Sequence, residues 1–94
     1  MTHGFLRMIS NAINEGQRAA RKFPQPNYVA LKVAEEAGEV VKAAVHCAEG
    51  RESMDNARAE VTQLVAMLWR LWEEGDAVIG LAPLKGGTDD QPLS

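Results

Sequence analysis

Several features that mark secreted, membrane or disulfide-bonded proteins are scarce or missing in this chain of 94 residues. Cys47 is the single cysteine, so no internal disulfide can form. No apolar run reaches the length of a membrane span, and the first residues include His3, Gly4 and Arg7 rather than a continuous apolar core. We therefore expect a cytoplasmic protein with neither a signal peptide nor a membrane partner.

Residues that favour strands are also few. Aromatic residues make up only 5% of the chain, and β-branched residues do not alternate with polar ones over any strand-length run. The four prolines lie outside the long segments of helical periodicity. The composition thus predicts an all-α protein with one small hydrophobic core.

The chain lacks the excess of basic residues that a protein binding a polyanion usually has. The net charge is −3, so we expect no nucleic-acid polymer as a partner. One short basic cluster contains Arg18, Arg21 and Lys22. Such a cluster is usual where a helix ends, because cations there complement the helix dipole. It is also compatible with contacts to the phosphates of a small nucleotide.

Helical periodicity and capping residues divide the chain into three long helices. Pro24 and Pro26 end the first helix, Asn27 is a candidate N-cap, and Gly50 and Gly75 are candidate stops. Ser53 or Asp55 is expected to cap the third helix. The expected helices cover residues 4–22, 27–48 and 53–74.

The C-terminal part of the chain is predicted to be less regular. Asp76 is expected to cap a short C-terminal helical turn reaching Leu81. The sequence beyond Pro83 is rich in glycine and polar residues and reads as a mobile tail. We therefore predict a single helical domain over residues 1–84 and a flexible tail over residues 85–94.

Two pairs of polar residues stand out against this helical pattern. Glu36 with Glu39, and Glu60 with Gln63, are each spaced three residues apart, so each pair projects from one side of a helix. At about 100° per residue, Glu36 lies at the edge of an apolar arc. Glu60 lies well inside the apolar face of the third helix, where an unpaired carboxylate is costly to bury.

Antiparallel packing of the second and third helices would bring Glu36, Glu39 and Glu60 together. Three carboxylates at one place repel each other unless they are protonated or neutralised by a cation. Oxygen ligands favour Mg²⁺ or Mn²⁺. An ion pair between Glu60 and Lys32 or an arginine would equally neutralise the buried charge of Glu60. In addition, the pattern Glu-Glu-x-x-Glu is common on helix faces that are exposed to solvent. The pattern alone leaves these alternatives open.

The run over residues 31–40, LKVAEEAGEV, followed by Glu60, resembles the MazG-like all-α nucleoside triphosphate pyrophosphohydrolases. Their signature is Glu-x-x-Glu, a variable spacer and Glu-x-x-Asp on two antiparallel helices. The resemblance covers residues 29–72. Phosphoribosyl-ATP pyrophosphatase shares the pattern, and an enzyme of that kind is the close alternative.

Carried over to this chain, the resemblance implies a set of metal ligands. Glu36 and Glu39 would bind Mg²⁺, and Glu60 would supply another ligand. Gln63 stands where the family has Asp. Its carbonyl can still ligate a hard cation, but without charge and more weakly. A catalytically weakened helical binding module, or a plain interaction bundle, is therefore an alternative.

The resemblance also implies two catalytic roles. Glu35 would hold a further metal or orient the attacking water, and Lys32 would lie near the phosphates. The implied reaction is Mg²⁺-dependent hydrolysis of a nucleoside triphosphate between the α- and β-phosphates. Phe5 and Asn14 on the first helix are the candidates for contacting the base.

The apolar surface of the third helix indicates whether several copies of the chain assemble. Its apolar residues cover a broader arc than the helices of one chain are expected to bury, and Trp69 extends the arc to the far side. We therefore expect the bundle to be completed by oligomerisation, and the resemblance implies a homodimer or homotetramer. The other residues of the arc are Val61, Leu64, Val65, Leu68, Leu71 and Trp72.

Overall fold

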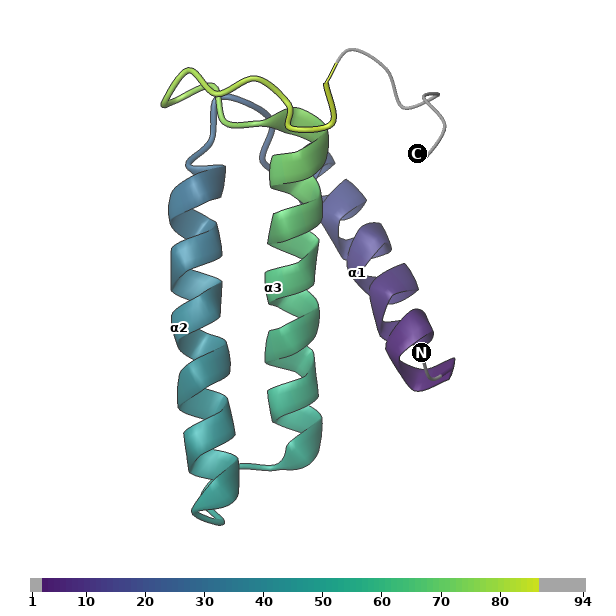
Figure 1. Ribbon diagram of the computed structural model, residues 1–94, viewed down its shortest axis with the longest axis vertical. Coiled ribbons are helices and arrows are strands. Elements are labelled where there is room, and N and C mark those ends of the chain that lie inside the picture. Colours follow the sequence, from purple (N-terminus) through teal and green to yellow (C-terminus); the bar gives the residue numbers. More distant parts are fainter. Residues whose placement is uncertain (1–2, 87–94) are drawn as a thin grey trace.

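The computed structural model describes residues 3–86 and consists of three helices (Figure 1). They are α1 (His3–Lys22), α2 (Val29–Ala48) and α3 (Met54–Glu74). No strand is present in this described range, although one isolated antiparallel bridge is. The expected all-α fold is confirmed. The residues of the predicted tail from 87 to 94 lie outside the described residues. None of the described helices is long and apolar enough to cross a membrane.

Helix α3 is the centre of the arrangement. It packs against α2, which runs antiparallel to it, and against α1 (Figure 1). Within residues 3–86, α1 and α2 have no Cα atoms within 8 Å of each other. α1 lies close to α3 at its C-terminal end and diverges from it towards its N-terminus. The small core between α1 and α3 is formed by Ala12, Ala66 and Met67.

The close approach of α1 to α3 depends on Gly16. A Cβ atom at this position would lie 2.5 Å from Cε3 of Trp69 and 3.1 Å from the carbonyl oxygen of Ala66. Gly16 is buried in this contact, so the indole of Trp69 packs directly on the backbone of α1. Part of the apolar arc that suggested oligomerisation is thus covered within the chain.

Local signals set both ends of α3. The hydroxyl of Ser53 accepts a hydrogen bond from the Asn56 N–H at 3.0 Å, which makes Ser53 the N-cap. Gly75 ends the helix with φ of 68°, a conformation that glycine adopts without strain. Gly50, with φ of 73°, follows the end of α2 as expected.

The start of α2 differs from the expectation. Asn27 is not its N-cap, because the Asn27 side chain donates to the carbonyl oxygen of Phe23 at 3.3 Å. The buried carboxylate of Asp76 takes this place instead: its Oδ2 accepts from the Ala30 N–H at 2.9 Å. Its Oδ1 accepts from the Val78 N–H at 2.9 Å. A side chain from the far end of the chain therefore caps α2.

The expected helical turn from Asp76 to Leu81 is wrong. Asp76 and Leu81 form the isolated antiparallel bridge and exchange two backbone hydrogen bonds of 2.9 Å. The chain turns back instead because Gly80 has φ of 74°, a left-handed conformation that a right-handed helical turn does not contain. Lys85, placed in the tail by the sequence, forms an ion pair of 2.7 Å with Glu73.

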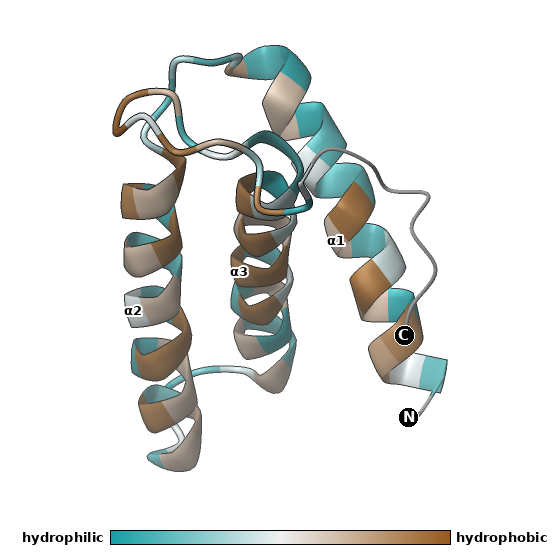
Figure 2. Ribbon diagram, turned by 45° about the horizontal axis from the view of Figure 1, so that its top comes forward, coloured by the Kyte–Doolittle hydropathy of each residue, from teal (hydrophilic) through white to brown (hydrophobic). Residues whose placement is uncertain are grey.

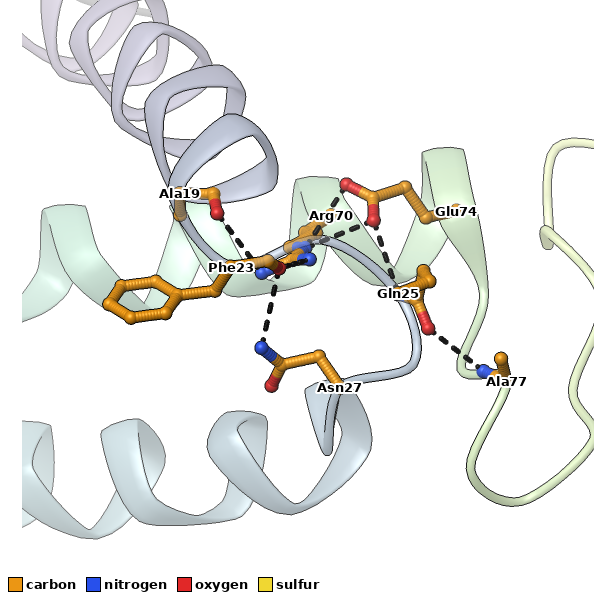
Figure 3. Close-up of polar contacts among 7 residues, drawn as sticks. All are labelled: Ala19, Phe23, Gln25, Asn27, Arg70, Glu74 and Ala77. Atoms are coloured by element: carbon orange, nitrogen blue, oxygen red, sulfur yellow. Dashed lines mark hydrogen bonds and ion pairs between the residues drawn. The ribbon is translucent and has the colours of Figure 1, made fainter.

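A buried arginine ties the ends of α1 and α3 together (Figure 3). Arg70 Nε donates to both carboxylate oxygens of Glu74 at 3.1 Å. Its other nitrogens donate to the carbonyl oxygens of Ala19, at 3.4 Å, and Phe23 at the end of α1. Gln25 extends this network, since its amide donates to Glu74 at 3.1 Å. The guanidinium thus caps the C-terminal carbonyls of α1.

Candidate functional site

Glu36 and Glu60 both lie on the sides of α2 and α3 that carry the buried residues of these helices. Glu36 is seven residues from Val29 and seven from Ala43, the two buried residues of α2. Glu60 is seven residues before Met67, which is buried on α3. Seven residues are close to two helical turns, so each acid lies in line with buried apolar residues. Both glutamates are half-buried.

The electrostatics place these carboxylates near each other. The pKa of Glu36 is raised above its ordinary value of 4.5, first by burial and then by repulsion from Glu60, Glu39 and Glu35. Lys32 acts in the opposite direction. Glu60 is the strongest of the three neighbouring acids although it belongs to another helix. The antiparallel packing of α2 and α3 therefore brings together the acids that the sequence grouped.

The residues around Glu36 on α2 differ in their exposure to solvent. Glu39 and Glu35 are exposed, whereas Lys32 is half-buried beside Glu36. At about 100° per residue, Glu39 projects about 60° round α2 from Glu36, and Glu35 about 100°. Glu39 therefore shares the side of α2 that carries Glu36, and Glu35 lies further round.

No basic side chain neutralises Glu60 by an ion pair among residues 3–86. The buried arginine of α3, Arg70, pairs with Glu74 instead. A pair of Glu60 with Lys32 or an arginine, one of the alternatives left open by the sequence, is therefore not found. No ion pair within residues 3–86 therefore offsets the repulsion of Glu60 on the half-buried Glu36.

Gln63 has different surroundings from Glu60. It is exposed and lines an open hollow of about 430 Å³ between α1 and α3. Asn14 and Arg18 of α1 line the same hollow, and Arg18 there forms an ion pair of 3.3 Å with Glu15. Of the expected ligands, Gln63 is thus the one that lies towards α1. Arg21 and Lys22 lie in the last turn of α1, where basic side chains complement the helix dipole, as the sequence predicted.

Sequence reasoning missed Asn11 and Thr62, which line this hollow and a second one of about 750 Å³. Phe5, a candidate for contacting the base, lines the second hollow. The hollow forms where α1 diverges from α3. The recurrence of Asn11 and Asn14 three residues apart on one side of α1 was the available signal.

The fit of a metal ion can be judged from the donors present. In the described part of the chain, no three His, Cys, Asp or Glu side chains are placed to hold a metal ion together. The donor chemistry nevertheless fits a hard divalent cation, because Glu36, Glu39 and Glu60 offer carboxylate oxygens. A cation would also relieve the repulsion that raises the pKa of Glu36.

Comparisons with known proteins find no match: no protein-family model matches the sequence, and no curated protein or solved structure is significantly similar to it. The resemblance to the MazG-like enzymes therefore depends on residues 31–40 and Glu60.

Proposed function

We propose that this protein is a Mg²⁺-dependent nucleoside triphosphate pyrophosphohydrolase that produces a nucleoside monophosphate and pyrophosphate. One observation carries the proposal. Burial, and then repulsion from Glu60 on the neighbouring helix, raises the pKa of Glu36, and no ion pair neutralises either carboxylate within residues 3–86. Keeping such acids together costs stability, which is typical of a site that binds a cation.

The residues around this pair have complementary roles in the proposal. Glu36, Glu39 and Glu60 hold the cation, and Lys32 binds a phosphate oxygen beside them. Arg18 and Asn14 line the neighbouring hollow and offer hydrogen-bond donors to the rest of the nucleotide. Glu35, which lies further round α2, would hold a further metal ion or orient the attacking water, as the resemblance implies.

The reaction is a displacement at the α-phosphorus. The oxygen of water bonds to this phosphorus, and the bond to the oxygen that bridges the α- and β-phosphates breaks. Pyrophosphate leaves with the bridging oxygen, and the proton of the water passes to solvent. Bound Mg²⁺ would supply charge neutralisation and a water of lowered pKa. The protein contributes mainly the positioning of charged groups.

The test measures pyrophosphate release from a panel of ribo- and deoxynucleoside triphosphates, modified nucleotides and phosphoribosyl-ATP, with Mg²⁺ or Mn²⁺. Glu36→Gln and Glu39→Gln should abolish release, while Gln63→Asp should preserve or raise it. Glu49→Gln, an exposed acid at the end of α2, is the matched control and should retain activity. Release from phosphoribosyl-ATP alone would select the alternative enzyme class.

A non-catalytic nucleotide-binding module is the second candidate. It is favoured by the position of Gln63, which lies at the hollow beside α1 where the related signature has a carboxylate. This candidate predicts that a nucleotide binds in calorimetry without pyrophosphate release. The absence of release with any nucleotide, together with no thermal shift on adding Mg²⁺ or Mn²⁺, would contradict the enzyme.

A further inference from the structure

The smaller hollow beside α1, of about 430 Å³, has a polar lining. Apart from Ala59, every residue that lines this polar hollow carries a polar or charged side chain. The neighbouring hollow of about 750 Å³ is lined mainly by apolar residues, such as Phe5, Met8 and Val61, and is called the apolar hollow. Figure 2 shows why the two differ: hydrophobic residues of α1 gather in its N-terminal half, and hydrophilic residues dominate its C-terminal half. The two hollows therefore suit different parts of a ligand.

The polar hollow suits a group with several hydroxyls better than a base or a phosphate. A base would find no aromatic side chain to stack on among its lining residues. A phosphate would meet the carboxylate of Glu15, and Arg18, the one basic residue of the lining, already forms an ion pair with Glu15 at 3.3 Å. Hydroxyl groups, by contrast, can donate to the carboxylate and accept from the carboxamides. Of the parts of a nucleotide, the ribose fits this description.

The polar hollow lies on the same side of the bundle as the carboxylate site. Glu39 projects about 60° round α2 from Glu36. Gln63, which lines the polar hollow, is displaced by the same angle and in the same sense round α3 from Glu60. Because α2 and α3 run antiparallel, these equal rotations lead to one side of the helix pair (Figure 1). Gln63 is therefore next to the acids that are proposed to bind the cation.

The polar hollow also has the position that a ribose requires. The Cβ atoms of residues three apart on a helix are about 5–6 Å from each other, so the hollow begins one turn from Glu60, at Gln63. Asn11 and Thr62 line both hollows, so the polar hollow continues into the apolar one. A nucleotide has the same order, since its ribose joins the phosphates to the base. The apolar hollow, with the aromatic ring of Phe5, would then receive the base.

Glu15 is the residue of the polar hollow best suited to recognise a ribose hydroxyl. Its side chain is 35% exposed, compared with 69% for Arg18, whose guanidinium holds the carboxylate in place. A carboxylate accepts strong hydrogen bonds, and acidic residues bind the ribose 2′-hydroxyl in dinucleotide-binding folds. The side-chain amides of Asn11 and Asn14 form none of the hydrogen bonds found within residues 3–86, so they remain available to the other oxygens of the sugar.

We propose that the polar hollow holds the ribose of the substrate, with Glu15 accepting a hydrogen bond from the 2′-hydroxyl, and that the protein hydrolyses ribonucleoside triphosphates in preference to their 2′-deoxy forms. This rests on the proposed function and adds the sugar to it. A site that hydrogen-bonds a hydroxyl discriminates against the analogue that lacks it. Because the hollow is open to solvent, we expect a preference of roughly tenfold in kcat/KM, the low end for a hydrogen bond to a charged group.

The preference is measured as pyrophosphate release from pairs of nucleotides that share a base, such as ATP with dATP and CTP with dCTP. Glu15→Ala should lower kcat/KM for the ribonucleotide about tenfold and leave that for the deoxynucleotide unchanged, so that their ratio falls to about one. Glu49→Ala is the matched control and should keep the wild-type ratio. Glu49 also forms an ion pair with an arginine, Arg51, but lies at the end of α2 and lines neither hollow.

A binding measurement separates the sugar site from the proposed reaction. Calorimetry with Mg²⁺ uses the α,β-methylene analogues of ATP, CTP and their 2′-deoxy forms, which cannot be cleaved between these phosphates. The ribose form should bind with a Kd about tenfold lower. No release from any nucleotide, with this preference in binding retained, would refute the reaction and support the sugar site. Equal Kd or equal kcat/KM values within a pair, binding of none of the analogues, or a ratio that Glu15→Ala leaves intact would overturn the sugar site.

Discussion

Replacing Arg70 by methionine gives a direct test of how the fold is held at one end. The guanidinium is buried, with 1% of its side chain exposed, and pairs with a Glu74 side chain that is 22% exposed. Removing one partner of a buried ion pair costs about 3–5 kcal/mol. Because Glu74 keeps some solvent and its hydrogen bond from Gln25, we expect a loss of about 3 kcal/mol, near the lower end of that range.

The loss is measured by urea denaturation followed by circular dichroism at one fixed protein concentration. It corresponds to a fall in Tm of roughly 15 °C for a domain of this size. Arg18→Met is the control, because the Arg18 side chain is 69% exposed in its pair with Glu15 and should contribute less than about 0.5 kcal/mol. If Arg70→Met lost less than about 1 kcal/mol, the guanidinium would not hold α1 to α3 as described.

Two further perturbations follow from the same contacts. Because its pKa is raised in the folded state, the Glu36 carboxyl binds a proton more readily there than in the unfolded chain, and its charge lowers stability as pH rises above 4.5. Glu36→Gln should therefore raise the urea midpoint at about pH 8 and leave it unchanged at about pH 3.5, and the same gain at both values would refute the repulsion. Asp76→Ala should cost about 2 kcal/mol and speed amide exchange at Ala30, since a buried helix cap is lost. Asp76→Asn keeps an acceptor oxygen and should cost less, so equal losses would contradict the capping role.

The sequence predicted the features of the fold that depend on neighbouring residues. Ser53 and Gly75 mark the two ends of α3, because an N-cap residue and a C-terminal glycine each act on the adjacent turn of the helix. The missed contacts are long-range: Asp76 caps α2 through the N–H of Ala30, 46 residues before it, and Arg70 reaches back 51 residues to Ala19. Helical periodicity carries no information on such partners, and the predicted cap at Asn27 is therefore wrong.

The same distinction applies to the candidate site. The pattern of Glu36 and Glu60 within apolar stripes predicted their approach, because only the antiparallel pairing of α2 and α3 was needed. The surroundings of Gln63 depend on where α1 packs against α3, and the sequence of α1 does not define this position. Gly16 illustrates the point: glycine only weakens a helix when judged from local sequence, whereas in the structure its missing side chain lets Trp69 pack on the backbone of α1.

The central claim is that the acids of α2 and α3 form a cation-dependent site for hydrolysing a nucleotide. The most direct measurement is pyrophosphate release from the nucleotide panel, with Mg²⁺ and then with EDTA, for the wild type and Glu36→Gln. We predict release by the wild type with Mg²⁺, and none with EDTA or in the variant. Release that persists undiminished in Glu36→Gln, or no release from any nucleotide with Mg²⁺ or Mn²⁺, would contradict the claim.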